Sequence, residues 1–217
     1  MRALFYLFIL SIPVLSQTIV WNSVEFPPSL ITKGELKDKG YSDSARLLMT
    51  DKIKKFTHKV EYVNSARAIN NLKTKQNYCF SGLNKNEQRE KFIYFSKPFM
   101  YSLPNEIVIK KEKLDKFKKY IDSDGLIDFD KLLKDKSLRL VYTKERAYSH
   151  FIDNIIKNRE NNENIVYRPA SDLTKGFLKM LEANRADYII EYPVMVAYNS
   201  NSEFISNPIK NSSEVFP

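Results

Sequence analysis

Short β-forming runs alternate with segments of helical periodicity along this chain, and the whole alternation occurs twice. In the first half, the predicted strands are Thr18–Trp21, a run through Val60 and Tyr62, and Tyr78–Phe80. One predicted helix between them begins at Ser42 or Asp43, and a second begins at Ser65. Because strands that alternate with helices form parallel sheets covered by helices, the first half predicts a βαβαβ unit.

The second half repeats this alternation. Its predicted strands are Glu106–Ile109, Leu138–Tyr142, Ile165–Tyr167 and Tyr188–Glu191. Its predicted helices are Leu126–Leu133, a helix that starts at Tyr148, and a helix capped by Ser171 or Asp172. Two such units predict an α/β protein with two lobes, each a mainly parallel sheet flanked by helices. Open α/β sheets bind ligands at the carboxyl ends of their strands, so the candidate site residues are those that follow strands.

Apolar residues at helical spacing predict which face of each helix is buried. In the first helix these residues are Ala45, Leu48, Met49, Ile53 and Phe56. In the helix after Ser65 they are Ala66, Ile69 and Leu72. A third stripe contains Tyr148, Phe151, Ile152, Ile155 and Ile156, and a fourth contains Leu173, Phe177, Met180 and Leu181. Each stripe is expected to pack against its sheet.

The first sixteen residues predict a cleavable secretory signal. Arg2 is followed by the apolar run Ala3–Leu15, which is too short to span a bilayer, and Val14 and Ser16 are small residues at the −3 and −1 positions. We expect cleavage after Ser16 and a periplasmic or otherwise exported protein. An uncleaved anchor and a buried first strand are the alternatives for this segment.

The net charge of +9 does not by itself indicate nucleic-acid binding. Lysines alternate with acids, as in Lys110–Lys116, which is typical of a solvated face, and we expect no nucleic-acid partner. The sequence has no nucleophile elbow, phosphate-binding glycine loop or zinc motif, and His58 and His150 are its only histidines. We therefore predict a protein that is not an enzyme and that uses no cofactor or metal. Cys79, the only cysteine, is expected to be buried or to pair outside this sequence.

Several segments together resemble the family-3 bacterial solute-binding proteins, the periplasmic amino-acid-binding type. Relatives of that type carry a T-x-x-R element before an F-S-x-P-[YF] segment. The segments that carry the resemblance are Trp21, Phe26–Pro28, Cys79–Glu90, Phe95–Phe99, Arg146–Tyr148 and Ala186–Pro193. Together they span about residues 18–200, and the R-x-Y element at Arg146 looks like that of an uncharacterised branch. The resemblance implies the two-lobed periplasmic binding protein type II fold.

The resemblance also implies a carboxylate-binding arginine in lobe 1. Arg89 stands at the arginine position of the T-x-x-R element, and its planar guanidinium suits bidentate recognition of a carboxylate. Gly82 and Asn84 lie on the turn before it and would offer backbone or amide groups to the ligand. A surface ion pair of Arg89 with Glu87 or Glu90 is the alternative.

In lobe 2, the resemblance implies an acidic residue that holds the ligand amine after the last core strand. Glu191 is the matching residue. Arg146 and Tyr148 begin a helix whose N-terminus favours an anion, although Tyr148 also fits the apolar stripe of that helix. Phe26 or Trp21 would form the apolar wall of the site. The clamp predicted from the sequence therefore has Arg89 on one wall and Glu191 on the other.

These patterns divide the chain into a signal segment at 1–16, lobe 1 at 17–105, lobe 2 at 106–200 and a return crossing at 201–217. Type II binding proteins return to lobe 1 with a strand and closing helices, so we expect the C-terminal part to be truncated and the return crossing to be incomplete.

The predicted function is that of an exported, monomeric solute-binding protein. It would capture a small polar solute, an amino acid or related carboxylate, between its lobes and deliver it to the membrane permease of an ABC transporter. The alternatives are an enzyme on the same scaffold, such as a cyclohexadienyl-dehydratase-like lyase, and a sensory ligand-binding module.

Overall fold

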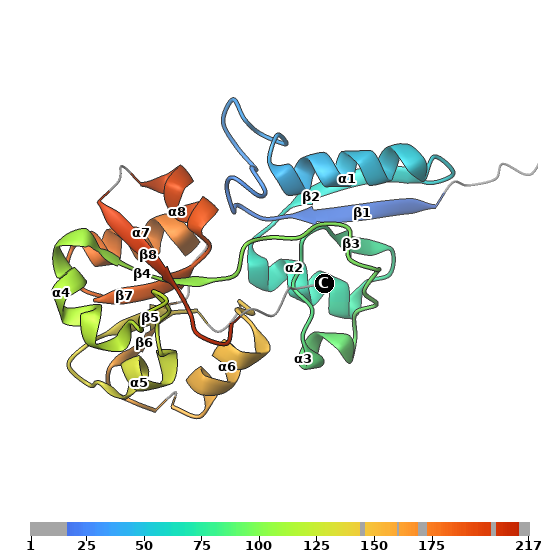
Figure 1. Ribbon diagram of the computed structural model, residues 1–217. Helices are drawn as coiled ribbons and strands as arrows, with labels where there is room; N and C mark the ends of the chain where they lie inside the picture. The colour runs from blue at the N-terminus through green and yellow to red at the C-terminus, as the bar shows by residue number, and fades with distance from the viewer. Residues whose placement is uncertain (1–16, 144–145, 160, 169–172, 201–202, 213–217) are drawn as a thin grey trace, which may run out of the picture.

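The structure of the protein, a computed structural model, has two α/β lobes that lie side by side (Figure 1). It describes residues 17–143, 146–159, 161–168, 173–200 and 203–212. The predicted signal segment at 1–16 and the predicted helix caps Ser171 and Asp172 lie outside the described residues. In the described part, no helix combines the length and the apolar character needed to cross a membrane.

Lobe 1 contains a three-stranded parallel sheet with the order β2-β1-β3. Its strands are β1 (Thr18–Ser23), β2 (Thr57–Tyr62) and β3 (Tyr78–Phe80). Its helices are α1 (Tyr41–Lys52), α2 (Ser65–Thr74) and α3 (Glu87–Glu90). The predicted βαβαβ unit is therefore confirmed, because helices separate the three strands in sequence and the strands run in one direction.

Lobe 2 contains a five-stranded mixed sheet with the order β6-β5-β7-β4-β8. Its strands are β4 (Glu106–Lys110), β5 (Leu140–Tyr142), β6 (Ile165–Tyr167), β7 (Tyr188–Glu191) and β8 (Phe204–Pro208). β5 runs parallel to β6 and β7, whereas β4 runs antiparallel to β7 and β8. β8 pairs along the whole length of β4, so a segment that we expected in the return crossing is an edge strand of lobe 2.

Helices cover both faces of the lobe 2 sheet (Figure 1). They are α4 (Leu114–Phe117), α5 (Phe129–Lys134), α6 (His150–Lys157), α7 (Leu173–Glu182) and α8 (Pro193–Asn199), with short 3-10 turns at Lys111–Lys113 and Lys118–Tyr120. Ile107 and Ile109 of β4 face one apolar cluster, while Val108 between them faces the other. A strand buried on both faces is apolar at every position, which explains the continuous apolar runs in β4 and β7. β7 therefore carries Glu191, at its end, into a buried environment.

The burial predicted for Leu48 in α1 is wrong, whereas Ala45, Met49, Ile53 and Phe56 of the same predicted stripe are half-buried. Leu48 is 71% exposed, whereas Ser42, Asp43 and Arg46 are buried. The Asp43 carboxylate accepts hydrogen bonds from the backbone N–H groups of Ile31 (2.9 Å) and Gly40 (3.2 Å). This helix packs on the loop before it through these hydrogen bonds, so part of its buried face is polar.

Other helix predictions agree with the structure more closely. Ile152 and Ile156 of α6 are buried, and Phe151 and Ile155 pack against the same core. The helix begins at His150, with Ser149 as its N-cap, so Tyr148 precedes it rather than opening it. The apolar stripe of α6 is confirmed, and the helix begins two residues later than predicted.

Lobe 1 has less apolar cover than lobe 2. Its one cluster of buried apolar residues among those the structure describes contains Val24, Leu30 and Ala68. Ile69 and Leu72 of α2, predicted to pack on the sheet, are only half-buried, and Ala66 is exposed. All three line a large cavity.

Candidate functional site

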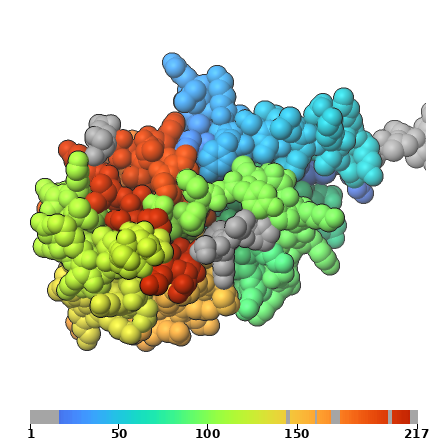
Figure 2. Space-filling model, viewed as in Figure 1, coloured from blue at the N-terminus to red at the C-terminus, as the bar shows by residue number. Residues whose placement is uncertain are grey.

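A cavity of about 1240 Å³ runs along lobe 1 and reaches the boundary with lobe 2. Lobe 2 contributes Arg146, Ala147 and Tyr192 to its lining, and lobe 1 contributes the rest. Figure 2 shows the blue-to-green lobe meeting the yellow-to-red lobe directly on one face of the molecule. The cavity therefore has one end where side chains of the two lobes face each other.

Direct hydrogen bonds join the lobes at this end. The Asn84 side-chain amide donates to the Tyr192 hydroxyl (2.9 Å) and to the Ala147 carbonyl (3.3 Å). Elsewhere on the boundary, the Asn199 amide donates to the Pro27 carbonyl (3.3 Å). Asn84 is thus a lobe 1 residue that already contacts the opposite wall.

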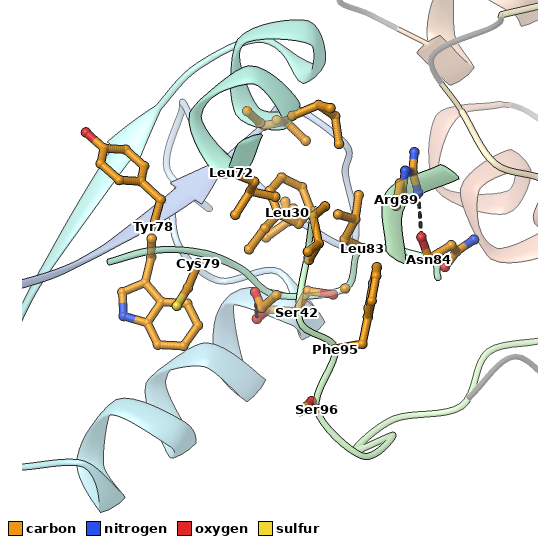
Figure 3. Close-up of a pocket in the computed structure, with 18 of the residues that line it drawn as sticks. Leu30, Ser42, Leu72, Tyr78, Cys79, Leu83, Asn84, Arg89, Phe95 and Ser96 are labelled. Carbon is orange, nitrogen blue, oxygen red and sulfur yellow. Dashed lines mark hydrogen bonds between the residues drawn. The ribbon is translucent and has the colours of Figure 1, made fainter. Parts of the chain in front are cut away.

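Arg89 lies beside Asn84 at the same end of the cavity (Figure 3). Its Nη1 donates to the Asn84 carbonyl at 2.5 Å, and the Asn86 side chain caps the short helix α3 that carries it. Only 9% of Arg89 is exposed, and burial lowers the pKa of its guanidinium while the charge of Asp153 opposes that change. Arg89 is therefore a largely buried cation in the lining of the cavity.

The turn before Arg89 also lines the cavity, and Gly82 in this turn adopts a φ of +83°. A Cβ at this position would lie 3.0 Å from the Ser42 hydroxyl oxygen. The positive φ and the close approach both favour glycine. Around this turn, Figure 3 shows apolar side chains that include Leu30, Leu72, Leu83 and Phe95.

Glu191 is bound by other residues of the chain. Arg146 forms a bidentate pair with it, Nη1 to Oε2 at 2.8 Å and Nη2 to Oε1 at 2.5 Å. The Thr174 hydroxyl donates to Oε2 at 2.7 Å, and the backbone N–H of Tyr192 donates to Oε1 at 2.8 Å. The Glu191 side chain is 0% exposed and that of Arg146 is 7% exposed. The carboxylate therefore sits behind Arg146 as seen from the cavity.

Aromatic rings surround the Arg146 guanidinium. Its Cζ lies 4.9 Å from the ring centroids of Tyr148 and Tyr192 and 5.3 Å from that of Phe26. The Asn105 side-chain oxygen accepts from Nη2 at 2.9 Å. Burial lowers the pKa of Arg146, but the charge of Glu191 and the hydrogen bonds to it more than offset this and raise the pKa above its ordinary value. Arg146 is therefore a permanent cation enclosed by rings from both lobes.

The structure thus brings the predicted residues together in two layers. The cavity is lined by Gly82, Asn84, Arg89, Arg146, Phe26 and Trp21. Glu191 and Tyr148 lie behind it, and Tyr148 belongs to the lobe 2 core while its hydroxyl accepts from the Thr143 N–H (3.2 Å). The Trp21 indole N–H donates to Nδ1 of His58 at 3.1 Å, so the polar edge of the indole ring is already hydrogen-bonded within lobe 1.

Sequence reasoning missed several partners of this site. Tyr192 directly follows β7, so the same strand-end rule that selected Glu191 could have selected it. Asn105 precedes β4 and Thr174 lies in α7, and no spacing in the sequence connects either of them to Arg146 or Glu191. These contacts depend on the packing of distant segments.

Asp153 in α6 is a further residue that the sequence did not point to, and the pKa of its carboxyl group is shifted. Its Oδ1 accepts from the Tyr148 N–H at 3.1 Å. Burial raises the pKa of its carboxyl group to about 6, although that hydrogen bond and the charge of Arg89 both act to lower it. Folding therefore disfavours the ionised form relative to an unfolded carboxyl of pKa about 3.9.

Asp153→Asn is expected to stabilise the protein at neutral pH. The free energy of unfolding of the wild-type protein should fall as pH rises from about 4 to about 6, because the pKa of Asp153 is higher in the folded than in the unfolded state. Above that range the free energy of unfolding should stay at the lower value. After a discount for partial exposure, the variant should gain about 1–2 kcal/mol at pH 7 and nothing at pH 4. Urea unfolding across this range measures the difference, with Glu182→Gln on an exposed helix end as the control. An equal gain at both pH values would contradict this account.

Comparison with known proteins identifies the fold. No protein-family model and no curated protein matches the chain. A Streptococcus pneumoniae amino-acid ABC transporter substrate-binding protein bound to L-arginine is similar with a TM-score of 0.64 at 14% identity, over 93% of this chain and 79% of that chain. A histidine kinase sensor domain with similarity to periplasmic binding proteins is similar with a TM-score of 0.67 at 14% identity, over 90% of this chain and 78% of that chain. An ancestral amino-acid-binding protein described as a precursor of cyclohexadienyl dehydratase has a TM-score of 0.63 at 16% identity, over 91% of this chain and 83% of that chain.

This chain therefore has the fold of the periplasmic binding proteins, with two α/β lobes and a cavity that reaches their boundary. The fold class predicted from the sequence is confirmed. The structures that resemble the chain include amino-acid-binding proteins of ABC transporters, which agrees with the family resemblance in the sequence.

Proposed function

We propose that the chain is an exported solute-binding protein that captures a small carboxylate-bearing solute at the boundary of its lobes, for delivery to an ABC permease. The observation that carries this proposal is the end of the cavity where Arg89 and Asn84 of lobe 1 face Arg146 and Tyr192 of lobe 2. A site formed by both lobes couples ligand binding to lobe closure, because the solute contacts both walls only when they approach.

Arg89 is the proposed anchor for the ligand carboxylate. Its guanidinium is largely buried and belongs to a cavity whose lining as a whole is mostly apolar. A charge-assisted hydrogen bond in such surroundings is stronger than one in water. Asn84 and the backbone of Gly82 would supply further polar contacts beside it.

Arg89→Ala is expected to weaken binding of the ligand by about 100-fold, because it removes a charge-assisted contact at a buried site. The measurement is titration calorimetry with small carboxylates, first to find a ligand for the wild type and then to compare the variant. Arg67→Ala, a lobe 1 surface arginine whose side chain is 64% exposed, is the matched control. Unchanged affinity of the Arg89 variant for a confirmed ligand would remove the carboxylate assignment.

A sensory role is the second candidate, and the similarity to a histidine kinase sensor domain favours it. Both roles use the same binding event and differ in the partner that reads it. Pull-down from membranes with and without the identified ligand separates them, since a transport role predicts a permease and a sensory role predicts a kinase. Incubation with the ligand followed by mass spectrometry tests the remaining alternative, because a lyase would form product.

A further inference from the structure

The Glu191 carboxylate is saturated by the protein itself. Each of its oxygens accepts two hydrogen bonds, one from Arg146 and one from either Thr174 or the Tyr192 N–H. A carboxylate offers about four lone-pair sites, and all are filled here. With none of its side chain exposed, Glu191 has no acceptor left for a cation that enters from the cavity.

Arg146 occupies the position that a bound organic cation would take. It lies between Glu191 and the cavity, with Phe26 of lobe 1 and Tyr148 and Tyr192 of lobe 2 around its guanidinium. A carboxylate on one edge and aromatic faces around it are the features by which proteins enclose guanidinium and ammonium groups. The chain thus supplies its own cation to this subsite.

The rest of the cavity lining is also unsuited to a cation. Among the described residues that line it, none is an aspartate or glutamate. Its charged members are Lys73, Lys75, Lys97, Arg89 and Arg146, all of them basic. Asp153 is near Arg89 but is not part of the lining. Among the described lining residues, an ammonium group would therefore lose water without gaining a carboxylate partner.

We infer that Arg146 is a resident cation of the cleft and that the cleft accepts a small organic carboxylate without an amino group. This inference rests on the proposed function and narrows its substrate class. Arg89 would bind the carboxylate, the apolar wall around Leu83 and Phe95 would take the rest of the solute, and the Arg146–Glu191 pair would exclude α-amino acids.

The first test compares ligands that differ only in the group in question. Full-length protein is titrated with 2-hydroxy acids and with α-amino acids of matched side chains: lactate and alanine, 2-hydroxy-4-methylpentanoate and leucine, and phenyllactate and phenylalanine. Within the pair that binds, the hydroxy acid is expected to bind at least about tenfold more tightly. Tighter binding of the amino acid overturns this inference and leaves the proposed function standing, whereas binding of neither series overturns both.

The second test vacates the subsite. In Arg146→Ala, Glu191 becomes accessible, so the preference for hydroxy acids should narrow or reverse, and millimolar ethylguanidinium should raise the melting temperature by several degrees. The same salt should not stabilise the wild type or the double variant Arg146→Ala/Glu191→Gln. Arg146→Gln serves the same comparison if the alanine variant does not fold. Equal effects of ethylguanidinium on all of these proteins would overturn the resident-cation assignment.

Discussion

Arg146→Met is expected to lower the free energy of unfolding by about 3–5 kcal/mol. The reason is Glu191, whose carboxylate would stay fully buried without its bidentate cation. The two remaining donors, the Thr174 hydroxyl and the Tyr192 N–H, would still form hydrogen bonds to the carboxylate but would not neutralise its charge. Urea unfolding followed by circular dichroism measures the loss.

Two controls make this prediction specific. Arg159→Met removes a partly exposed arginine from its pair with Asp130 and should cost less than about 1 kcal/mol. The double variant Arg146→Met/Glu191→Met should be more stable than Arg146→Met alone, because it leaves no unpaired charge. A double variant whose loss equals the sum of both single losses would show that charge is not the cause.

Gly40→Ala is expected to lower the free energy of unfolding by about 3 kcal/mol. Gly40 is the N-cap of α1, and a Cβ there would lie 2.1 Å from the Ser29 carbonyl oxygen and 2.9 Å from Oδ2 of Asp43. The first contact is with backbone, which cannot rotate away as a flexible side chain could. The substitution would therefore separate α1 from the loop that Asp43 holds through the Ile31 N–H.

The control for Gly40→Ala is Gly34→Ala. Gly34 has a φ of +78°, and a Cβ added there would meet no atom within 4 Å, so its substitution costs only the backbone conformation, about 1 kcal/mol. Fluorescence of Trp21, the only tryptophan, reports the unfolding of lobe 1. Equal losses from the two substitutions would contradict the steric explanation.

The loop that Gly40 supports also contributes to the site. Phe26, whose ring faces the Arg146 guanidinium, exchanges backbone hydrogen bonds with Leu30 of the same loop. Ser29 in this loop bonds to Ser42 of α1 through their hydroxyl groups at 2.8 Å. The buried polar face of α1 thus fixes the segment through which lobe 1 touches the resident cation.

Local patterns in the sequence were sufficient to predict the architecture of this protein. Alternating strand and helix patterns predicted the strands of both lobes except β8, because local periodicity reflects which faces of a segment are buried. The runs Glu106–Ile109 and Tyr188–Glu191 predicted strands, and β4 and β7 are strands covered on both faces. Residues that follow strands, such as Gly82 and Asn84 after β3, also line the candidate cavity, since loops at the carboxyl edge of a sheet converge in space.

The partners of the charged groups, in contrast, depend on how distant segments pack. Glu191 and Arg146 stand 45 residues apart, and their mutual hydrogen bonds turn a predicted ligand contact into an internal ion pair. Asp43 of α1 is buried because the neighbouring loop offers backbone donors to its carboxylate, a contact that the periodicity of the helix did not indicate. The apolar periodicity of a helix or strand indicates which of its faces is buried. The hydrogen-bond partners of a side chain depend instead on which distant segments come into contact, and the packing of the whole chain determines those contacts.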